Sequence, residues 1–354
     1  MGETEEEVIG VILLNLGGPD SLQAVRPFLY NLFSDREIIR LGHPIFQKPL
    51  AFFISYFRSI KTKRLYSLIG NKSPILDITL AQAKALEVAL NQNSEIRTQK
   101  SELRSQKLHL GRVKEGARFK TFVGMRYWHP FIDEVVPEIY KKGIKRLVAL
   151  NLYPQYSHAT TGSSLSVLKK VLLKCPMEVS FIASWFDHPL YIEALVDVIK
   201  NGLKSFKYEQ LKPYAGLNVH VLFSAHNLPE ALIKEGDPYV KQIECTIEEI
   251  TKRLSIKWSL SYQSKTGLVK WLEPTTEKAI EKLAREGIKN VLVVPISFVS
   301  DHIETLYEID ILYKNIAEKN GIFLKRVDSL NTHPIFIEAL KDIVLNNVRE
   351  KGWI

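Results

Sequence analysis

The stretch VIGVILLNLGGP, residues 8–19, is a nearly continuous apolar run that ends in two glycines and a proline. Such a run is typical of a strand that is buried on both faces of a parallel sheet and leaves it through a tight turn. The same pattern returns at residues 219–229, where VHVLFS leads through AHN to a leucine and a proline. We therefore expect two equivalent strands, each opening a parallel sheet.

Extended and helical patterns alternate along the whole chain. The predicted strands are residues 8–16, 121–125, 146–152, 179–182, 219–224, 258–262, 291–296 and 323–327. Helical periodicity fills the intervals, most clearly at residues 73–90, 130–142, 189–206, 239–254, 274–285 and 334–349. This alternation predicts the α/β class with parallel sheets.

An internal repeat divides the chain into two halves. KGIKRLV at residues 142–148 aligns with EGIKNVL at residues 286–292 with an offset of 144, and His158 falls opposite His302 at the same offset. The opening strands match at an offset of 210, which leaves the first half with 66 additional residues. We predict two similar doubly wound halves around a shared cleft, with residues 1–187 forming the first and 188–354 the second. The C-terminal helix is expected to pack back on the first half.

Composition limits the function classes. The 354 residues exceed the roughly 250 to 300 at which a single core stops growing, so two core units are expected. Two cysteines are too few for a disulfide framework, a zinc knuckle or a four-thiolate iron–sulfur cluster. The N-terminus is acidic, and no apolar stretch approaches the roughly 18 residues of a membrane span. These features predict a cytoplasmic protein.

Two surface features extend the first half. Residues 97–120 carry eight basic residues against two acidic ones, which accounts for most of the net charge of +9. This basic segment lacks a nucleic-acid module, so we expect no nucleic-acid partner, and either a solvated loop or a basic surface explains it. The other feature, residues 49–64, is called the lip: the apolar stretch PLAFFISYF followed by four basic residues. It suits peripheral contact with the inner face of a membrane or with a large apolar ligand, and the alternative is a helix packed on the domain.

Two groups of side chains at predicted strand ends can carry chemistry. His226 follows a buried strand, where a neutral imidazole can accept a proton or ligate a metal; a core histidine is the alternative. On a helix beginning near Asp301, the side chains of Asp301, Glu304 and Glu308 would form a column of carboxylates. The alternative is an N-cap at Asp301 with Glu304 closing a capping box.

A third group points to the ligand. Arg126 and Tyr127 follow a predicted strand, and Tyr66 and Ser73 flank a Gly-Asn turn. An arginine at a strand end can bind a carboxylate with two hydrogen bonds, and tyrosines offer flat apolar faces. The combination indicates an aromatic ligand that carries acid groups.

Taken together, the motifs resemble those of the ferrochelatase family. They are LNLGGP at 14–19, YPQYS at 153–157 with TGSS at 161–164, SAHNLP at 224–229, GDPY at 236–239, YQSK at 262–265 and DHIETLYE at 301–308. The resemblance implies a chelatase fold of two Rossmann-like halves and a lyase that inserts Fe²⁺ into protoporphyrin IX with release of two protons, the last step of haem biosynthesis.

The resemblance also implies roles for individual residues. His226 would be the metal-site and proton-abstracting residue, with Glu304 as its partner at the metal. Porphyrin contacts fall on Leu16, Tyr66, Ser73, Arg126 and Tyr127, and the surrounding polar network on Asp301, His302 and Glu308.

Some positions depart from the family pattern. Asn227 stands where Ser or Gly is usual. Animal members carry a cysteine-bound [2Fe–2S] cluster, but His158 occupies one of those cysteine positions and residues 351–354 hold no cysteine. We therefore expect no cluster and no other cofactor. The alternatives of a chelatase for coproporphyrin III and of a non-catalytic porphyrin carrier stay open, although DHIETLYE is more similar to the protoporphyrin-using branch.

Overall fold

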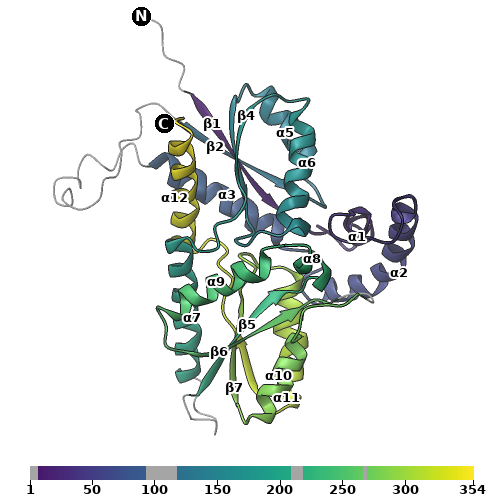
Figure 1. Ribbon diagram of the computed structural model, residues 1–354, viewed down its shortest axis with the longest axis vertical. Coiled ribbons are helices and arrows are strands. Elements are labelled where there is room, and N and C mark those ends of the chain that lie inside the picture. Colours follow the sequence, from purple (N-terminus) through teal and green to yellow (C-terminus); the bar gives the residue numbers. More distant parts are fainter. Residues whose placement is uncertain (1–6, 93–117, 209–217, 266–268) are drawn as a thin grey trace, which may run out of the picture.

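A computed structural model describes residues 7–92, 118–208, 218–265 and 269–354. Their strands form two four-stranded parallel sheets, with the orders β2-β1-β3-β4 and β6-β5-β7-β8 (Figure 1). The strands are β1 (Val8–Asn15), β2 (Arg118–Met125), β3 (Arg146–Asn151), β4 (Glu178–Ile182), β5 (Val219–His226), β6 (Lys257–Gln263), β7 (Asn290–Pro295) and β8 (Phe323–Arg326). All eight predicted strands are present, and the predicted two-halved α/β class is confirmed.

Helices separate the strands and cover both faces of each sheet. In the first half these are α1 (Val25–Ser34), η1 (Pro44–Phe46), α2 (Gln47–Ser67), α3 (Ile75–Asn91), α5 (Ile132–Lys141), η3 (His158–Gly162) and α6 (Ser163–Leu172). After α7 (Pro189–Tyr208), the second half has α8 (Glu230–Lys234), α9 (Tyr239–Thr251), α10 (Thr276–Arg285), η4 (Glu304–Tyr313), α11 (Lys314–Lys319) and α12 (Pro334–Glu350). The segments η3 and η4 are π-helices, and each follows the third strand of its half.

The apolar run of residues 8–16 forms a strand because both of its faces are covered. Ile12 and Leu14 pack with α5 and α6 on one side of the sheet, while Ile9, Val11 and Leu13 belong to the core on the other side. All five side chains have no solvent exposure. Burial of each such side chain stabilises the fold by about 1.5–3 kcal/mol. A structure that left one face of this stretch in water would lose that contribution for the side chains on that face.

Strand register confirms the internal repeat. In the first sheet Ile9 pairs with Arg146, and in the second Val219 pairs with Asn290. These pairs preserve the two offsets of 210 and 144 read from the sequence. The two halves therefore place equivalent residues at equivalent strand ends.

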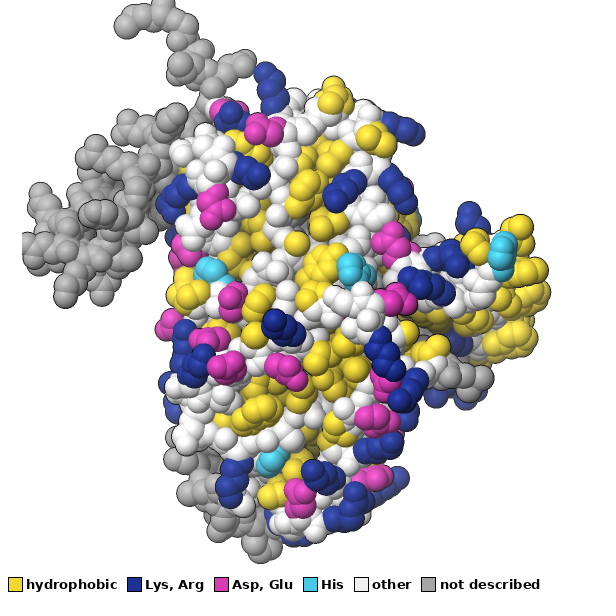
Figure 2. All heavy atoms as spheres, in the orientation of Figure 1, with side chains coloured by type: hydrophobic (Ala, Val, Ile, Leu, Met, Phe, Trp, Pro, Cys, Tyr) yellow, Lys and Arg dark blue, Asp and Glu magenta, His cyan; other side chains and the backbone are white. Residues whose placement is uncertain are grey.

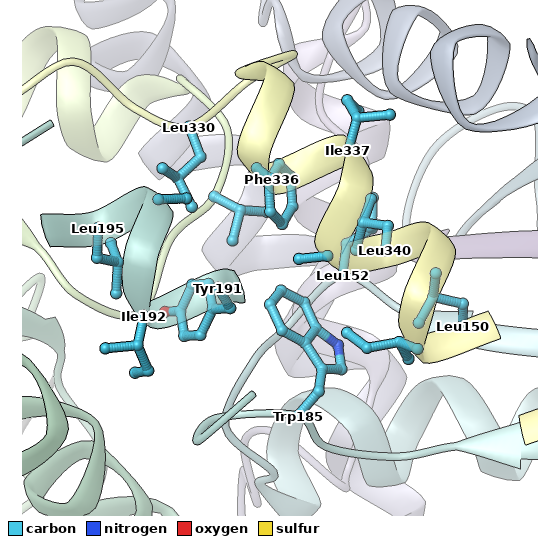
Figure 3. Packing of buried hydrophobic residues seen from close by; sticks show 14 of the residues in the cluster. Leu150, Leu152, Trp185, Tyr191, Ile192, Leu195, Leu330, Phe336, Ile337 and Leu340 are labelled. Carbon is cyan, nitrogen blue, oxygen red and sulfur yellow. The ribbon is translucent and has the colours of Figure 1, made fainter. Parts of the chain in front are cut away.

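The two halves are joined through a continuous core around α7 and α12. Trp185 packs edge to face against Tyr191, with ring centroids 4.9 Å apart, and lies 5.9 Å from the ring of Phe336 (Figure 3). Helix α12 contacts α3, β3 and β4 of the first half as well as α7. The C-terminal helix thus spans both halves and fixes the cleft between them.

The lip lies on α2, which projects from the body of the first half (Figures 1 and 2). Phe53, Phe57 and Ile60 are 59%, 67% and 57% exposed, and their spacing places them on one face of the helix. The opposite face packs inward through Ala51, Ser55 and Ser59. The inner face is packed on the domain, as the alternative interpretation of the lip predicted, but the outer aromatic face is not.

Two further expectations concern the surface. The basic segment lies outside the described residues, except for Arg118, Phe119 and Lys120, which begin β2. Among the described residues, no helix combines the length and apolar character that crossing a bilayer requires.

Candidate active site

The candidate site is a cleft between the carboxyl ends of the two sheets, the usual ligand position in parallel α/β folds. It holds a cavity of about 330 Å³. Its wall comes from the ends of β1, β3, β5, β6 and β7, from η3 and η4, and from α1 and the lip. Five of the predicted residues line it, namely Leu16, His226, His302, Glu304 and Glu308.

His226 ends β5 and is held from several sides. Its backbone N–H donates to Ser297 Oγ at 2.9 Å, and its carbonyl accepts from Tyr239 Oη at 3.0 Å. The imidazole Nδ1 lies 2.8 Å from Glu304 Oε2. With Nδ1 engaged by the carboxylate, Nε2 is the nitrogen left for a ligand in the cavity.

The carboxylates of Glu304 and Glu308 are brought together by the π-helix η4. The two residues are four apart, which is close to one turn of the helix, so their side chains lie on the same face. Ser264 Oγ joins the pair, since it lies 2.7 Å from Glu304 Oε2 and also contacts Glu308 Oε2. Gln263 Nε2 donates to the Glu304 carbonyl at 3.0 Å.

The predicted column of three carboxylates is wrong, and so is the capping box. Asp301 precedes the helix and turns away from Glu304, because Arg326 Nη1 binds its Oδ1 at 3.0 Å. Further donors to Asp301 are the side chains of Thr305, Ser329 and Asn331. Asp301 is therefore a structural anion that does not line the cavity.

Electrostatics give the site residues different charge states. Burial opposes charge on His226, but the charges of Glu304 and Glu308 outweigh it and raise its pKa. Burial likewise opposes ionisation of Glu304, whose pKa is nevertheless lowered by His226, His302 and Ser264. For Glu308, burial and the charge of Glu304 act together and raise the pKa to about 8. Near neutral pH the site thus holds an ionised Glu304 beside a protonated Glu308.

His302 lies at the rim of this network. Its Nδ1 is 3.0 Å from the Ser300 carbonyl and its Nε2 is 4.0 Å from Glu304 Oε1. Burial lowers its pKa, so it stays neutral while Glu304 carries the negative charge. The ring packs against Phe298 at 4.3 Å, which in turn lies 6.1 Å from His226. Phe298 thereby forms an apolar wall beside the two imidazoles.

Arg126 and Tyr127 are occupied by an internal partner. Arg126 Nη2 lies 2.6 Å from Asp35 Oδ2, and Tyr127 Oη donates to the same oxygen at 2.6 Å. Ser163 Oγ completes the cluster, accepting from Arg126 Nε at 2.7 Å. The pair that the sequence suggested for gripping a ligand carboxylate instead ties α1 to the first sheet, and neither residue lines the cavity.

Tyr66 and Ser73 also lie behind the cavity wall. Tyr66 is a buried residue in the last turn of α2, where burial and the charge of Glu304 raise its pKa. The backbone N–H of Ser73 donates to the Pro19 carbonyl at 2.8 Å. A Cβ on Gly18 would approach Ser73 Oγ to 2.5 Å, so the turn after β1 requires glycine there.

Several cavity residues were not singled out for a role at the sequence level. Arg58 and Thr62 lie one turn apart on the lip and line the cavity, as do Ser264 and Lys265 after β6. Arg58 makes no ion pair with any described residue, and its guanidinium lies 5.4 Å from the ring of Phe33. The helical spacing of Arg58 and Thr62 was the one signal available in the sequence.

Comparison with known proteins identifies the family. The sequence profile of ferrochelatases matches residues 8–348. The chain belongs to the ferrochelatase family. The ferrochelatase of Gloeothece citriformis is 46% identical over 353 residues, which cover 98% of this chain and 84% of that protein. The ferrochelatase of Geotalea daltonii is 45% identical over 350 residues, covering 98% and 99%.

A solved structure is similar as well. SirB from Bacillus subtilis with Fe³⁺ has a TM-score of 0.47 at 15% identity, over 66% of this chain and 84% of SirB. Membership of the ferrochelatase family confirms a metal chelatase of haem biosynthesis that acts on a porphyrin and iron. Among the described residues there is no group of three or more His, Cys, Asp and Glu side chains arranged to hold a metal ion. His226 and Glu304 both line the cavity and bring a nitrogen and an oxygen donor type to it.

Proposed function

We propose that the chain inserts Fe²⁺ into protoporphyrin IX, releasing two protons and forming protohaem in the last step of haem biosynthesis. The observation that carries the proposal is the pair of His226 and Glu304, 2.8 Å apart at the wall of an otherwise largely apolar cavity. A binding protein without chemistry has no need of a buried, proton-accepting pair at the ring.

The residues suit the steps of metallation. Neutral His226 accepts a pyrrole proton at Nε2, and Glu304 stabilises the imidazolium through Nδ1. Because a divalent cation binds only the deprotonated ligand, incoming Fe²⁺ drives the proton from His226. The iron then passes from these two donors to the four pyrrole nitrogens, and the second pyrrole proton goes to the freed Nε2 of His226; both protons leave His226 for solvent water. Apolar walls, including Leu16, hold the ring and exclude water from the exchange.

We further propose that Arg58 and Lys265 bind the propionates of the porphyrin. Both line the cavity, and Arg58 has no ion pair with a described residue. A guanidinium at the cavity wall can bind a carboxylate with two parallel hydrogen bonds. This assignment replaces the role that the sequence suggested for Arg126.

The test is an anaerobic assay with each porphyrin. Purified protein is mixed with Fe²⁺ or Zn²⁺ and protoporphyrin IX or coproporphyrin III, and the metalloporphyrin spectrum is followed. We expect the higher kcat/KM with protoporphyrin IX. A preference for coproporphyrin III would make the chain a chelatase of that substrate, and binding of both porphyrins without metallation would make it a carrier.

We propose that no resident cofactor takes part. The chain holds two cysteines, Cys175 and Cys245, which lie after α6 and within α9. A four-cysteine cluster cannot be built from them. Full activity in protein that has been treated with a chelator, dialysed and supplied only with Fe²⁺ and porphyrin would support this proposal, whereas a lasting loss of activity would contradict it.

We also propose that the lip rests on the inner face of the cytoplasmic membrane. Its exposed aromatic face and its basic residues Lys61, Lys63 and Arg64 suit the headgroup region of an anionic bilayer. The same helix lines the cavity through Arg58 and Thr62, so an apolar porphyrin could pass from the membrane surface to the site.

Vesicle binding tests the membrane proposal. We expect the protein to sediment with vesicles of phosphatidylcholine and phosphatidylglycerol, and the double variant Phe53→Ser, Phe57→Ser to stay in solution. Leu173→Ser is the matched control, because Leu173 is 86% exposed but lies at the end of α6, outside the lip. Equal sedimentation of the lip variant and the wild type would refute the contact.

A further inference from the structure

Ser264 stands at an unusual point of the backbone. It directly follows β6 and has a φ of 71°, in the left-handed region that disfavours side chains other than those of Gly, Asn and Asp. Glycine would satisfy this turn with less strain. The serine side chain therefore has to be explained by its contacts.

The hydroxyl of Ser264 joins the two carboxylates of η4. Its Oγ lies 2.7 Å from Glu304 Oε2 and also contacts Glu308 Oε2. A hydroxyl has a single hydrogen and can donate to only one of them. Its oxygen lies within hydrogen-bond reach of the other as well, so Ser264 bridges the two carboxyl groups.

The surroundings hold this arrangement in place. The neighbouring Gln263 donates from Nε2 to the Glu304 carbonyl, and its Oε1 accepts from Ser224 Oγ at 2.6 Å, which fixes the amide. The Gln263 carbonyl accepts the Asn227 N–H at 2.8 Å, next to His226. The end of β6 is thus tied both to η4 and to the strand that carries the imidazole.

We propose that Ser264 is a positioning residue for metallation: its hydroxyl holds Glu304 Oε2 toward His226 Nδ1 and links Glu304 to Glu308. This inference rests on the proposed function. Without the hydroxyl, Glu304 is free to turn away from the imidazole, and His226 loses the partner that orients Nε2 toward the ring. The porphyrin itself touches other walls, so its binding depends much less on Ser264.

Three variants separate the hydroxyl from the backbone. Ser264→Gly removes the hydroxyl and suits the positive φ, so we expect an unchanged or higher Tm but a 10- to 100-fold lower kcat with little change in the KM for porphyrin. Ser264→Asn tolerates the same backbone and offers two N–H donors, so we expect it to recover part of the lost kcat. Ser259→Ala removes a hydroxyl that bonds to His220 at the other end of β6, and we expect wild-type kinetics.

The outcomes are distinct. A Gly variant with wild-type kcat, or one whose loss lies only in KM, would overturn the positioning role while leaving the metallation proposal intact. A wild-type protein that metallates no porphyrin would overturn the proposed function and this inference with it. A low kcat for the Gly variant with normal porphyrin KM, together with partial recovery by Asn, would support the role.

Discussion

The two halves of the chain share a sheet order, a register and a π-helix after the third strand, but they differ in what stands at the cleft. The residue after β1 is Leu16, and its equivalent at the end of β5 is His226. By the offset of 144, the position equivalent to Glu304 is Thr160 in η3, and the one equivalent to Glu308 is Ser164 in the first turn of α6. One half therefore presents an apolar and neutral wall, while the other presents an imidazole with two carboxylates.

This difference assigns separate tasks to the same architecture. The first half and the lip provide an apolar wall and the cation Arg58 for a flat, acidic ligand. In the proposed reaction the second half provides the proton acceptors and the metal donors, and Lys265 for a propionate. The two sheets have the same strand order, and only a few residues at equivalent strand ends differ. These few differences give one half groups suited to holding a ligand and the other half groups suited to proton transfer.

The largest effect is expected from the equivalent positions His226 and Leu16. His226→Ala should lower kcat about a thousandfold, because both the proton acceptor and a metal donor are removed, while porphyrin binding persists. Leu16→Ala should lower kcat less than about tenfold, since it removes packing only. Zn²⁺ insertion rates together with quenching of porphyrin fluorescence check both. Similar losses in the two variants would abolish the proposed division between the halves.

Asp301 and Ser157 are also equivalent by the offset of 144, but only Asp301 anchors a buried cation. Asp301→Ala should lower the free energy of unfolding by about 3 kcal/mol: Arg326 keeps its ion pair with Asp310, but it loses its other carboxylate, and three side-chain donors lose their acceptor. Ser157→Ala, which removes a hydrogen bond to Asp237 and one from the Ala159 N–H, should cost about 1–2 kcal/mol. Urea unfolding at pH 7 measures both values, and equal costs would contradict the structural role of Asp301.

The contribution of the Asp301–Arg326 ion pair to stability depends on pH. Burial would raise the pKa of Asp301, but Arg326 and three hydrogen bonds hold it below the ordinary value. A carboxyl group whose pKa is depressed in the fold stabilises it above its unfolded pKa of about 3.9, and this contribution disappears as the pH falls through the folded pKa. The difference between wild type and Asp301→Asn should therefore shrink on acidification below about pH 4.

A smaller effect is expected at Glu308 and its equivalent Ser164. The folded pKa of Glu308 is about 8, above its unfolded value, so this group stabilises the fold at low pH and loses that contribution as the pH rises to about 8. We expect wild-type stability to fall by ~2 kcal/mol more between pH 5 and pH 8 than that of Glu308→Gln. Ser164→Ala should keep the wild-type slope. Parallel slopes for wild type and Glu308→Gln would show that Glu308 is ionised throughout.

The sequence predicted the repeated fold because its signals are local. Short apolar runs marked the strands, and the strongest of them, residues 8–16, lies within one residue of β1. The repeat in turn predicted that His226 and the block beginning at Asp301 share one cleft. Both of these features depend on residues that are neighbours along the chain or on a constant offset.

Whether a site residue is available to a ligand depends on contacts with side chains far away in the sequence, and no local sequence pattern shows these contacts. Arg126 is neutralised by Asp35, which lies 91 residues earlier, so its position at a strand end said nothing about its availability. The start of the η4 helix was misplaced because Asp301 is held outside it by Arg326. A π-helix has no distinct hydrophobic period in a short segment, which is why Glu304 and Glu308 were placed on an ordinary helix.

A double-mutant cycle tests most directly whether His226 and Glu304 form one catalytic unit. The rate of anaerobic Zn²⁺ insertion is measured for wild type, His226→Ala, Glu304→Gln and the double variant. The proposed mechanism predicts that Glu304→Gln alone lowers kcat about a hundredfold and that the double variant is no slower than His226→Ala, because the carboxylate and the imidazole hold the proton and the iron as one unit and neither acts without the other. A double variant whose loss equals the product of the two single losses would contradict the account, since the two side chains would then act independently.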